Sequence, residues 1–115
     1  MEIHITLPIK KKWFDMILSG EKKEEYREIK PYWTTRVYKA FSKIYKKRVP
    51  LYDYFSDSPY LNVKFINGYG RDKPMFVARC RVLKREGGNT DWGAEPHGKY
   101  YVFQIQEILD RRNLK

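Results

Sequence analysis

Apolar positions in the first twenty residues change from an alternating to a helical spacing. Residues 2–7 alternate and predict a half-buried strand with three apolar residues on one side: Ile3, Ile5 and Leu7. Pro8 is suited to the first turn of a helix, and helical spacing follows at Ile9, Trp13, Met16 and Ile17. We expect this helix to end at Gly20, because glycine enters left-handed geometry without steric cost.

Two further elements are predicted before residue 50. Residues 23–29 are expected to form a polar strand, in which Lys23, Glu25 and Arg27 share one face. Pro31 opens a second helix, about residues 32–47. Its apolar stripe consists of Trp33, Val37, Ala40, Phe41 and Ile44.

The rest of the chain has strand-like and loop-like patterns. Residues 50–59 form an aromatic-rich loop that either packs over a sheet or stacks on bases. Alternating apolar residues predict strands at 61–65, 74–83 and 100–109. A loop with four glycines, 87–99, precedes the last strand, and a polar tail of residues 110–115 follows it. Cys80 falls on an apolar face of its strand and is predicted to be a small buried hydrophobe.

The order of these elements indicates an α+β fold. One domain over residues 1–115 is expected for this length. No helices separate the late strands. We therefore expect the elements to bury their apolar faces by forming a small curved mixed sheet or open barrel with two helices on its surface.

The composition and net charge of the chain indicate which class of partner to expect. With 42% hydrophobic residues the chain can bury one core, and its single cysteine allows no internal disulfide, as in a cytoplasmic protein. No apolar run approaches the roughly 20 residues of a membrane helix, so no membrane partner is expected. A net charge of +10 favours a polyanionic partner, and we rank nucleic acid above anionic membranes and phosphorylated small molecules.

Several kinds of chemistry have no support in the sequence. Two histidines and one cysteine cannot close the usual zinc site, so no metal is expected. There is no phosphate-cradling loop, dinucleotide fingerprint or serine nucleophile elbow, and no cofactor is expected. His4 and His97 could in principle act as an acid–base pair in metal-free RNA cleavage, but we rank an ordinary surface histidine well above that role for each.

The candidate site is the polar stretch after the first helix. Lys22 can meet Glu25 and Arg27 only if it still belongs to the turn after Gly20, because on a strand it would face the other way. Arg27 offers a planar fork of donors for a phosphate or a base edge, and Lys22 offers a mobile charge. Glu25 could hold Arg27, accept hydrogen bonds from a base or act as a general base. An ion-paired turn with a purely structural role is the alternative.

Two features outside this stretch are candidates for nucleic-acid contacts. The second predicted helix carries a basic stripe without acids, formed by Arg36, Lys39, Lys43, Lys46 and Lys47. This stripe is either an anion-binding surface or a merely solvated face. Trp92, next to Gly93, is either a platform for base stacking or an anchor of its loop.

At Gly20, Lys22, Glu25 and Arg27 the chain resembles the Gly-x-Lys-x-x-Glu-x-Arg motif of the ASCH domain family. The resemblance covers most of the chain, since a strand and a helix precede the motif and a glycine-rich loop precedes a final Tyr-Tyr-Val-Phe-Gln-Ile strand. It implies a PUA-like mixed β-barrel of about five to six strands with two flanking helices. It also implies RNA binding in a cleft between barrel and helix that the motif residues line.

Two functions follow as hypotheses. The first is a nucleic-acid-binding module for RNA, with the following candidate binding residues: Lys22, Glu25, Arg27, Arg36, Lys39, Lys43 and Trp92. The second is a small metal-independent hydrolase, a ribonuclease or an acetylcytidine amidohydrolase, with Lys22 and Glu25 as its catalytic groups. Some small ASCH members are reported as amidohydrolases of acetylated cytidine, and they carry threonine where this chain has Glu25.

Overall fold

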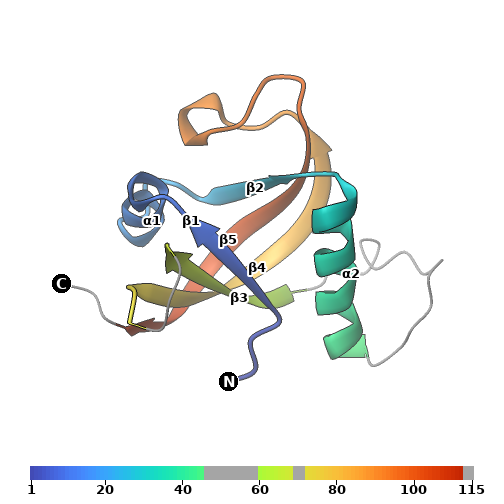
Figure 1. Ribbon diagram of the computed structural model, residues 1–115. Helices are drawn as coiled ribbons and strands as arrows, with labels where there is room; N and C mark the ends of the chain where they lie inside the picture. Colours follow the sequence, from blue (N-terminus) through green and yellow to red (C-terminus); the bar gives the residue numbers. More distant parts are fainter. Residues whose placement is uncertain (46–59, 69–71, 113–115) are drawn as a thin grey trace.

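The computed structural model describes residues 1–45, 60–68 and 72–112, and within them the chain folds as an α+β domain (Figure 1). Its elements, in chain order, are β1 (Ile5–Ile9), α1 (Lys11–Leu18), β2 (Glu24–Glu28), α2 (Pro31–Tyr45), β3 (Tyr60–Asn67), β4 (Met75–Glu86), the short 3₁₀ helix η2 (Thr90–Trp92) and β5 (Lys99–Arg112). The predicted α+β class with two helices is confirmed. The aromatic loop 50–59 and the basic residues Lys46 and Lys47 lie outside the described residues.

The five described strands form one mixed sheet in the order β1-β3-β4-β5-β2. β1 runs parallel to β3, and every other neighbouring pair is antiparallel. β1 and β2 are therefore the two edges, and the hydrogen-bond ladders do not close the sheet into a barrel. Register shifts in β4, at Val77/Ala78 and Arg79/Cys80, are β-bulges of the kind that bends strands. Figure 1 shows a curved sheet with α1 and α2 near its opposite ends.

The main core lies between the sheet and the two helices. Alternate residues of the strands point into it, as their apolar spacing predicts. The buried residues of this core that the sequence pattern identified are Ile5, Leu7, Ile9, Ile17, Val37, Ala40, Phe41, Leu61, Val63, Phe65, Phe76, Ala78, Cys80, Val82, Tyr101 and Phe103. Cys80 is fully buried and burial raises the pKa of its thiol, so the prediction of an inert hydrophobe is confirmed.

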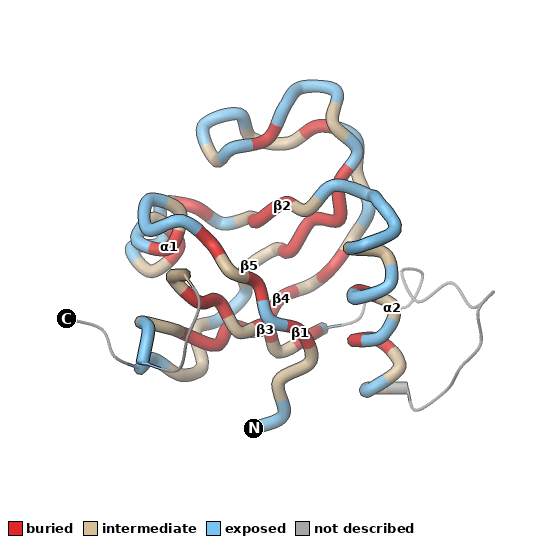
Figure 2. The backbone as a smooth tube through the Cα atoms, in the orientation of Figure 1, coloured by how far each residue is buried: buried red, intermediate tan, exposed pale blue. Residues whose placement is uncertain are grey.

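A second, smaller core lies on the other face of the sheet. The loop of residues 87–98 folds over β2 and β5 and buries Ala94 against Tyr26, Tyr100 and Val102. Figure 2 shows this loop exposed along much of its length, with buried positions where it approaches the sheet. The sequence predicted the loop but not this core, because alternation in the last strand indicates two faces without showing what covers the second.

Several predicted boundaries were wrong. Pro8 and Ile9 belong to β1 and not to the first helix, which begins at Lys11. Proline is tolerated there because β1 is an edge strand. The first strand begins at Ile5 and not at residue 2. β5 extends to Arg112, so the predicted polar tail is partly strand.

Candidate functional site

The turn between α1 and β2 places Lys22. Gly20 takes the left-handed conformation with φ 85°, and its backbone N–H donates to Ile17 O at 3.1 Å. The backbone N–H of Lys22 then donates to Met16 O at 2.9 Å, which ties the residue to the last turn of α1. β2 begins only at Glu24, so Lys22 belongs to the turn, as the predicted convergence required.

Lys22 is buried, with 1% of its surface exposed. Its Nζ lies 3.0 Å from Glu25 Oε1 and donates a hydrogen bond to the carbonyl oxygen of Trp92. The same ammonium lies over two aromatic rings, 4.3 Å from the ring centre of Trp13 and 5.4 Å from that of Tyr26. Burial lowers the pKa of Lys22, since the charged form loses its hydration, and the carboxylate of Glu25 partly opposes this shift.

Glu25 lies between two cations and is 4% exposed. Its Oε1 faces Lys22 and accepts the backbone N–H of Tyr26 at 3.2 Å, and its Oε2 lies 3.1 Å from Arg27 Nη1. A carboxylate offers about four acceptor positions. Three are occupied in this way, so Glu25 has little capacity left to accept hydrogen bonds from a base.

Arg27 bridges the two edges of the sheet. Its Nη1 donates to Tyr26 O in β2 at 2.7 Å, and its Nη2 donates to Pro8 O in β1 at 2.8 Å. The guanidinium lies 5.1 Å from the ring centre of Trp33 on α2. Of its five N–H groups, that on Nε and one on Nη2 have no partner among the described residues. The side chain is 15% exposed.

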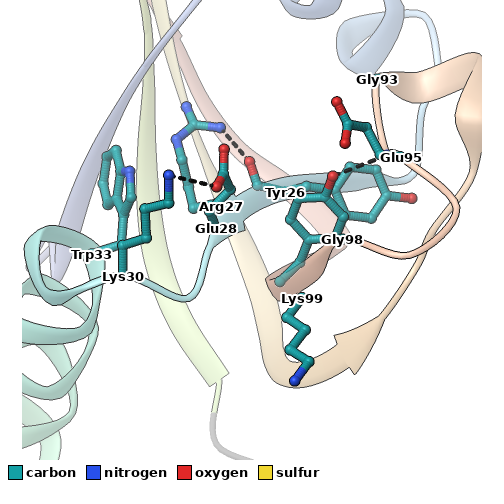
Figure 3. Close-up of a pocket in the computed structure, with 10 residues that line it drawn as sticks. Tyr26, Arg27, Glu28, Lys30, Trp33, Gly93, Glu95, Gly98 and Lys99 are labelled. Carbon is teal, nitrogen blue, oxygen red and sulfur yellow. Dashed lines mark hydrogen bonds and ion pairs between the residues drawn. The ribbon is translucent and has the colours of Figure 1, made fainter.

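Two adjoining hollows lie along β2. The first, of about 230 Å³, is lined by Glu25, Arg27, Trp13 and Trp92, among others, and we call it the paired-tryptophan hollow. The second, of about 390 Å³, is lined by Arg27 and Trp33, and we call it the Trp33 hollow (Figure 3). Both are lined by Tyr26, Arg27 and Gly93, so together they form one groove. All three tryptophans of the chain line this groove.

The structure brings Lys22, Glu25 and Arg27 together, but the three residues do not line the same hollow. Glu25 and Arg27 line the paired-tryptophan hollow, whereas Lys22 lies behind Glu25 and borders a different hollow, between α1 and β5. The expectation of a mobile charge at Lys22 was therefore wrong. The helix–strand turn buries it under Trp13 and the loop of residues 87–98.

The remaining predicted residues lie in several places. Trp92 is half-buried; its carbonyl anchors the loop through Lys22, and the residue lines the paired-tryptophan hollow. Arg36, Lys39 and Lys43 are exposed on α2 and line neither hollow. Lys43 Nζ donates to His4 O at 3.1 Å.

Neither histidine lines the groove. His4 is a structural residue, because its Nδ1 accepts the backbone N–H of Asn62 at 2.8 Å. His97 is exposed in the loop of residues 87–98. The geometry therefore gives no support to an acid–base pair of histidines in the groove.

Sequence reasoning missed two residues of the groove, Trp13 and Trp33, because helical spacing assigned both to the core. Both pack against the core and remain partly accessible. Trp13 follows three lysines, and Trp33 lies one helical turn before Arg36. Tryptophan at the boundary between an apolar stripe and a basic one is a signal that could have identified them.

A second polar cluster fixes β2 from its other face. Glu24 accepts hydrogen bonds from Arg85, from Gln104 at 3.0 Å and from Tyr26 Oη at 2.8 Å. Burial opposes ionisation of Glu24, but these donors outweigh it and lower the pKa of the carboxyl. Burial raises the pKa of Tyr26 to about 12, and its hydroxyl oxygen accepts the backbone N–H of Asn89 at 3.0 Å. Tyr26 thereby holds the start of the loop that covers the groove.

The charged residues that line the paired-tryptophan hollow are Lys10, Arg27 and Glu25, which together carry one net positive charge. Within the described residues there is no group of three or more side chains suited to a metal ion, and no helix long and apolar enough to cross a membrane. Comparison with known proteins gives no match, either to a family model, to a curated protein or to a solved structure.

Proposed function

We propose that this protein is a nucleic-acid-binding module whose ligand is RNA with unpaired bases. The observation that carries the proposal is the groove: all three tryptophans line it, and Arg27 offers two unused donors in its wall. Aromatic side chains bind unpaired bases by stacking, which contributes about 1–3 kcal/mol per base. Single-stranded RNA exposes such bases, whereas a duplex hides them.

Charge supports the same ligand. The basic stripe of α2 contributes Arg36, Lys39 and Lys43 without an acid on that helix, and the chain carries a net charge of +10. These residues are suited to contacts with successive phosphates, while the groove receives a base.

The resemblance to ASCH domains agrees with this proposal. Its implied cleft between barrel and helix corresponds to the groove between β2 and α2, where Arg27 and Trp33 meet. We extend the proposal to the fold: the curved sheet, with edges joined through Arg27 instead of a ladder, is an open variant of the PUA-like barrel that the resemblance implies.

The test is a titration of fluorescently labelled single-stranded RNA and DNA oligonucleotides at increasing salt. We expect RNA to bind, and the logarithm of its association constant to fall linearly with the logarithm of the salt concentration. Arg27→Lys should weaken it about tenfold, because lysine lacks the planar fork. The matched control is Arg79→Lys, at an exposed arginine of β4. Absence of binding at low salt, or unchanged affinity in Arg27→Lys, would refute the proposal.

A hydrolase in the same groove is the second candidate. The lowered pKa of Lys22 favours it, because a neutral amine can accept a proton or attack a carbonyl. Against it, the amine is covered by Trp13, Tyr26 and the carbonyl of Trp92, so only Glu25 faces a substrate in this hollow.

Turnover of RNA or of acetylated cytidine by purified protein tests the hydrolase. Activity that Lys22→Met abolishes and Lys23→Met leaves intact would support it, since Lys23 is the exposed neighbour of Lys22. Activity that survives Lys22→Met would assign the turnover to another source.

A further inference from the structure

We infer that the Trp33 hollow is a second nucleotide subsite, so that the groove holds two consecutive nucleotides with the linking phosphodiester on Arg27. This inference rests on the proposed RNA binding and specifies its footprint. One base would occupy the paired-tryptophan hollow, and the next nucleoside would occupy the Trp33 hollow.

The position of Arg27 supports a phosphodiester between the two nucleosides. Its side chain belongs to the common wall of the hollows, so a strand that passes from one to the other must cross it. Its two unused N–H groups lie on adjacent nitrogens, Nε and Nη2. Adjacent guanidinium donors match the two free oxygens of a phosphodiester in a bidentate contact.

The charges at this point agree with a single phosphate. In the paired-tryptophan hollow Lys10 and Arg27 exceed Glu25 by one positive charge, and a phosphodiester carries one negative charge. Glu25 does not repel it strongly, because its carboxylate already pairs with Lys22 at 3.0 Å and with Arg27 at 3.1 Å.

The Trp33 hollow itself is suited to a nucleoside and not to another phosphate. Besides Arg27, its charged lining consists of two lysines and two glutamates, Lys30, Lys99, Glu28 and Glu95, which balance one another. Lys30 already pairs with Glu28 at 2.9 Å. Figure 3 shows Trp33, Lys30 and Arg27 on one side of the hollow and Glu95 and Gly98 on the other. An indole wall with a neutral polar rim can contact a base and the ribose hydroxyls.

The volumes are in keeping with this division. The paired-tryptophan hollow, at about 230 Å³, is smaller than the roughly 300–1,000 Å³ of pockets for drug-sized ligands. It has room for a single base. The Trp33 hollow, at about 390 Å³, has room for a base with its sugar.

The experiment compares a dinucleoside monophosphate with the corresponding nucleoside 5′-monophosphate, using wild-type protein at low salt. We expect the dinucleoside monophosphate to bind about tenfold more tightly, because it adds a second stacked base. Indole N–H signals in ¹⁵N NMR spectra locate each ligand. The mononucleotide should shift the signals of Trp13 and Trp92, and the dinucleoside monophosphate should shift that of Trp33 as well.

A variant provides an independent check. Trp33→Leu should remove the advantage of the dinucleoside monophosphate over the mononucleotide. Its control is Tyr60→Leu, at an exposed aromatic residue that lines neither hollow. Equal affinity of the two ligands, or an unmoved Trp33 signal, would overturn the second subsite while RNA binding stands. If no oligonucleotide binds at low salt, the proposed function fails together with it.

Discussion

At the scale of single residues, Lys22 joins three parts of the molecule. Its backbone is held by α1, its ammonium pairs with Glu25 of β2, and it donates to Trp92 in the loop of residues 87–98. A buried lysine loses its hydration, which is costly unless ion pairs and hydrogen bonds replace it. The three partners of Lys22 provide that replacement, so the residue stabilises the groove without contacting its contents.

Replacing Lys22 by alanine should lower the free energy of unfolding by about 3 kcal/mol. This is the lower end of the cost of breaking a buried ion pair, because Arg27 still pairs with Glu25. Lys22→Met should cost less, since methionine refills the space without a buried charge. Urea denaturation measures both, and Lys23→Ala, at an exposed lysine, should stay within about 0.5 kcal/mol of wild type. Equal losses at positions 22 and 23 would contradict the structural role.

The lowered pKa of Glu24 makes the free energy of unfolding depend on pH in the acidic range. Its pKa in the folded protein lies below the ordinary value of 4.5, so the unfolded chain takes up this proton first. The stability that Glu24 contributes is therefore present above about pH 4.5 and is lost as the pH falls through the folded pKa. Urea unfolding between pH 3 and 6 should show a shallower acid loss in Glu24→Gln. Glu21→Gln, at an exposed glutamate, should keep the wild-type slope, and parallel slopes in all three proteins would argue against the Glu24 cluster.

At the scale of elements, the loop of residues 87–98 is part of the site and not a simple connection. Hydrogen bonds from β2 and β5 hold it at several points, including Asn89 N to Tyr26 Oη at 3.0 Å and Glu95 N to Tyr100 Oη at 2.9 Å. The loop places Trp92 in the wall of the same hollow as Trp13, which comes from α1. The paired-tryptophan hollow therefore depends on a loop and a helix that meet only in the folded chain.

Gly93 tests this dependence. Its φ is 98°, and a Cβ there would lie 3.1 Å from the ring of Trp13. Gly68 has a similar φ of 92° but nothing within 4 Å of such an atom. Both alanine variants should lose about 1 kcal/mol of stability from left-handed strain. Only Gly93→Ala should also weaken RNA binding, because it displaces Trp13. Equal binding by the two variants would show that the contact with Trp13 does not shape the groove.

At the scale of the whole molecule, Arg27 links strands that no ladder joins. β1 and β2 are the edges of the described sheet. The guanidinium donates hydrogen bonds to both of them, to Pro8 O in β1 and to Tyr26 O in β2. The curvature of the sheet brings these edges close enough for one side chain to span them. The site is therefore located where the sheet comes closest to closing.

Hydrogen exchange should report this link. Amides of the central strands β3, β4 and β5 should exchange most slowly, and those of the edges faster through local opening. Arg27→Lys should accelerate exchange in β1 as well as β2, because a single ammonium cannot replace the fork on both carbonyls. Mass spectrometry of peptic peptides measures this, with Arg79→Lys as the control. Acceleration confined to β2 would mean that Arg27 does not couple the two edges.

Much of the architecture could be predicted from the sequence, because periodicity depends on local geometry. The apolar alternation that gave Val63, Phe76 and Phe103 their buried faces is a property of each strand alone. Gly20 likewise indicated the end of α1 and placed Lys22 in a turn. Pro8 misled the prediction, because its suitability for a helix start and for an edge strand cannot be distinguished locally.

The sequence by itself determined the α+β class, the faces of its strands and helices, and the proximity of Lys22, Glu25 and Arg27 after one helix end. Only the tertiary structure decided which of them line the groove. Lys22 is covered by Trp92, seventy residues away, and Arg27 reaches Pro8, nineteen residues before it. The physical reason is that periodicity specifies the direction of a side chain, whereas its burial and partners depend on which distant segment packs over it.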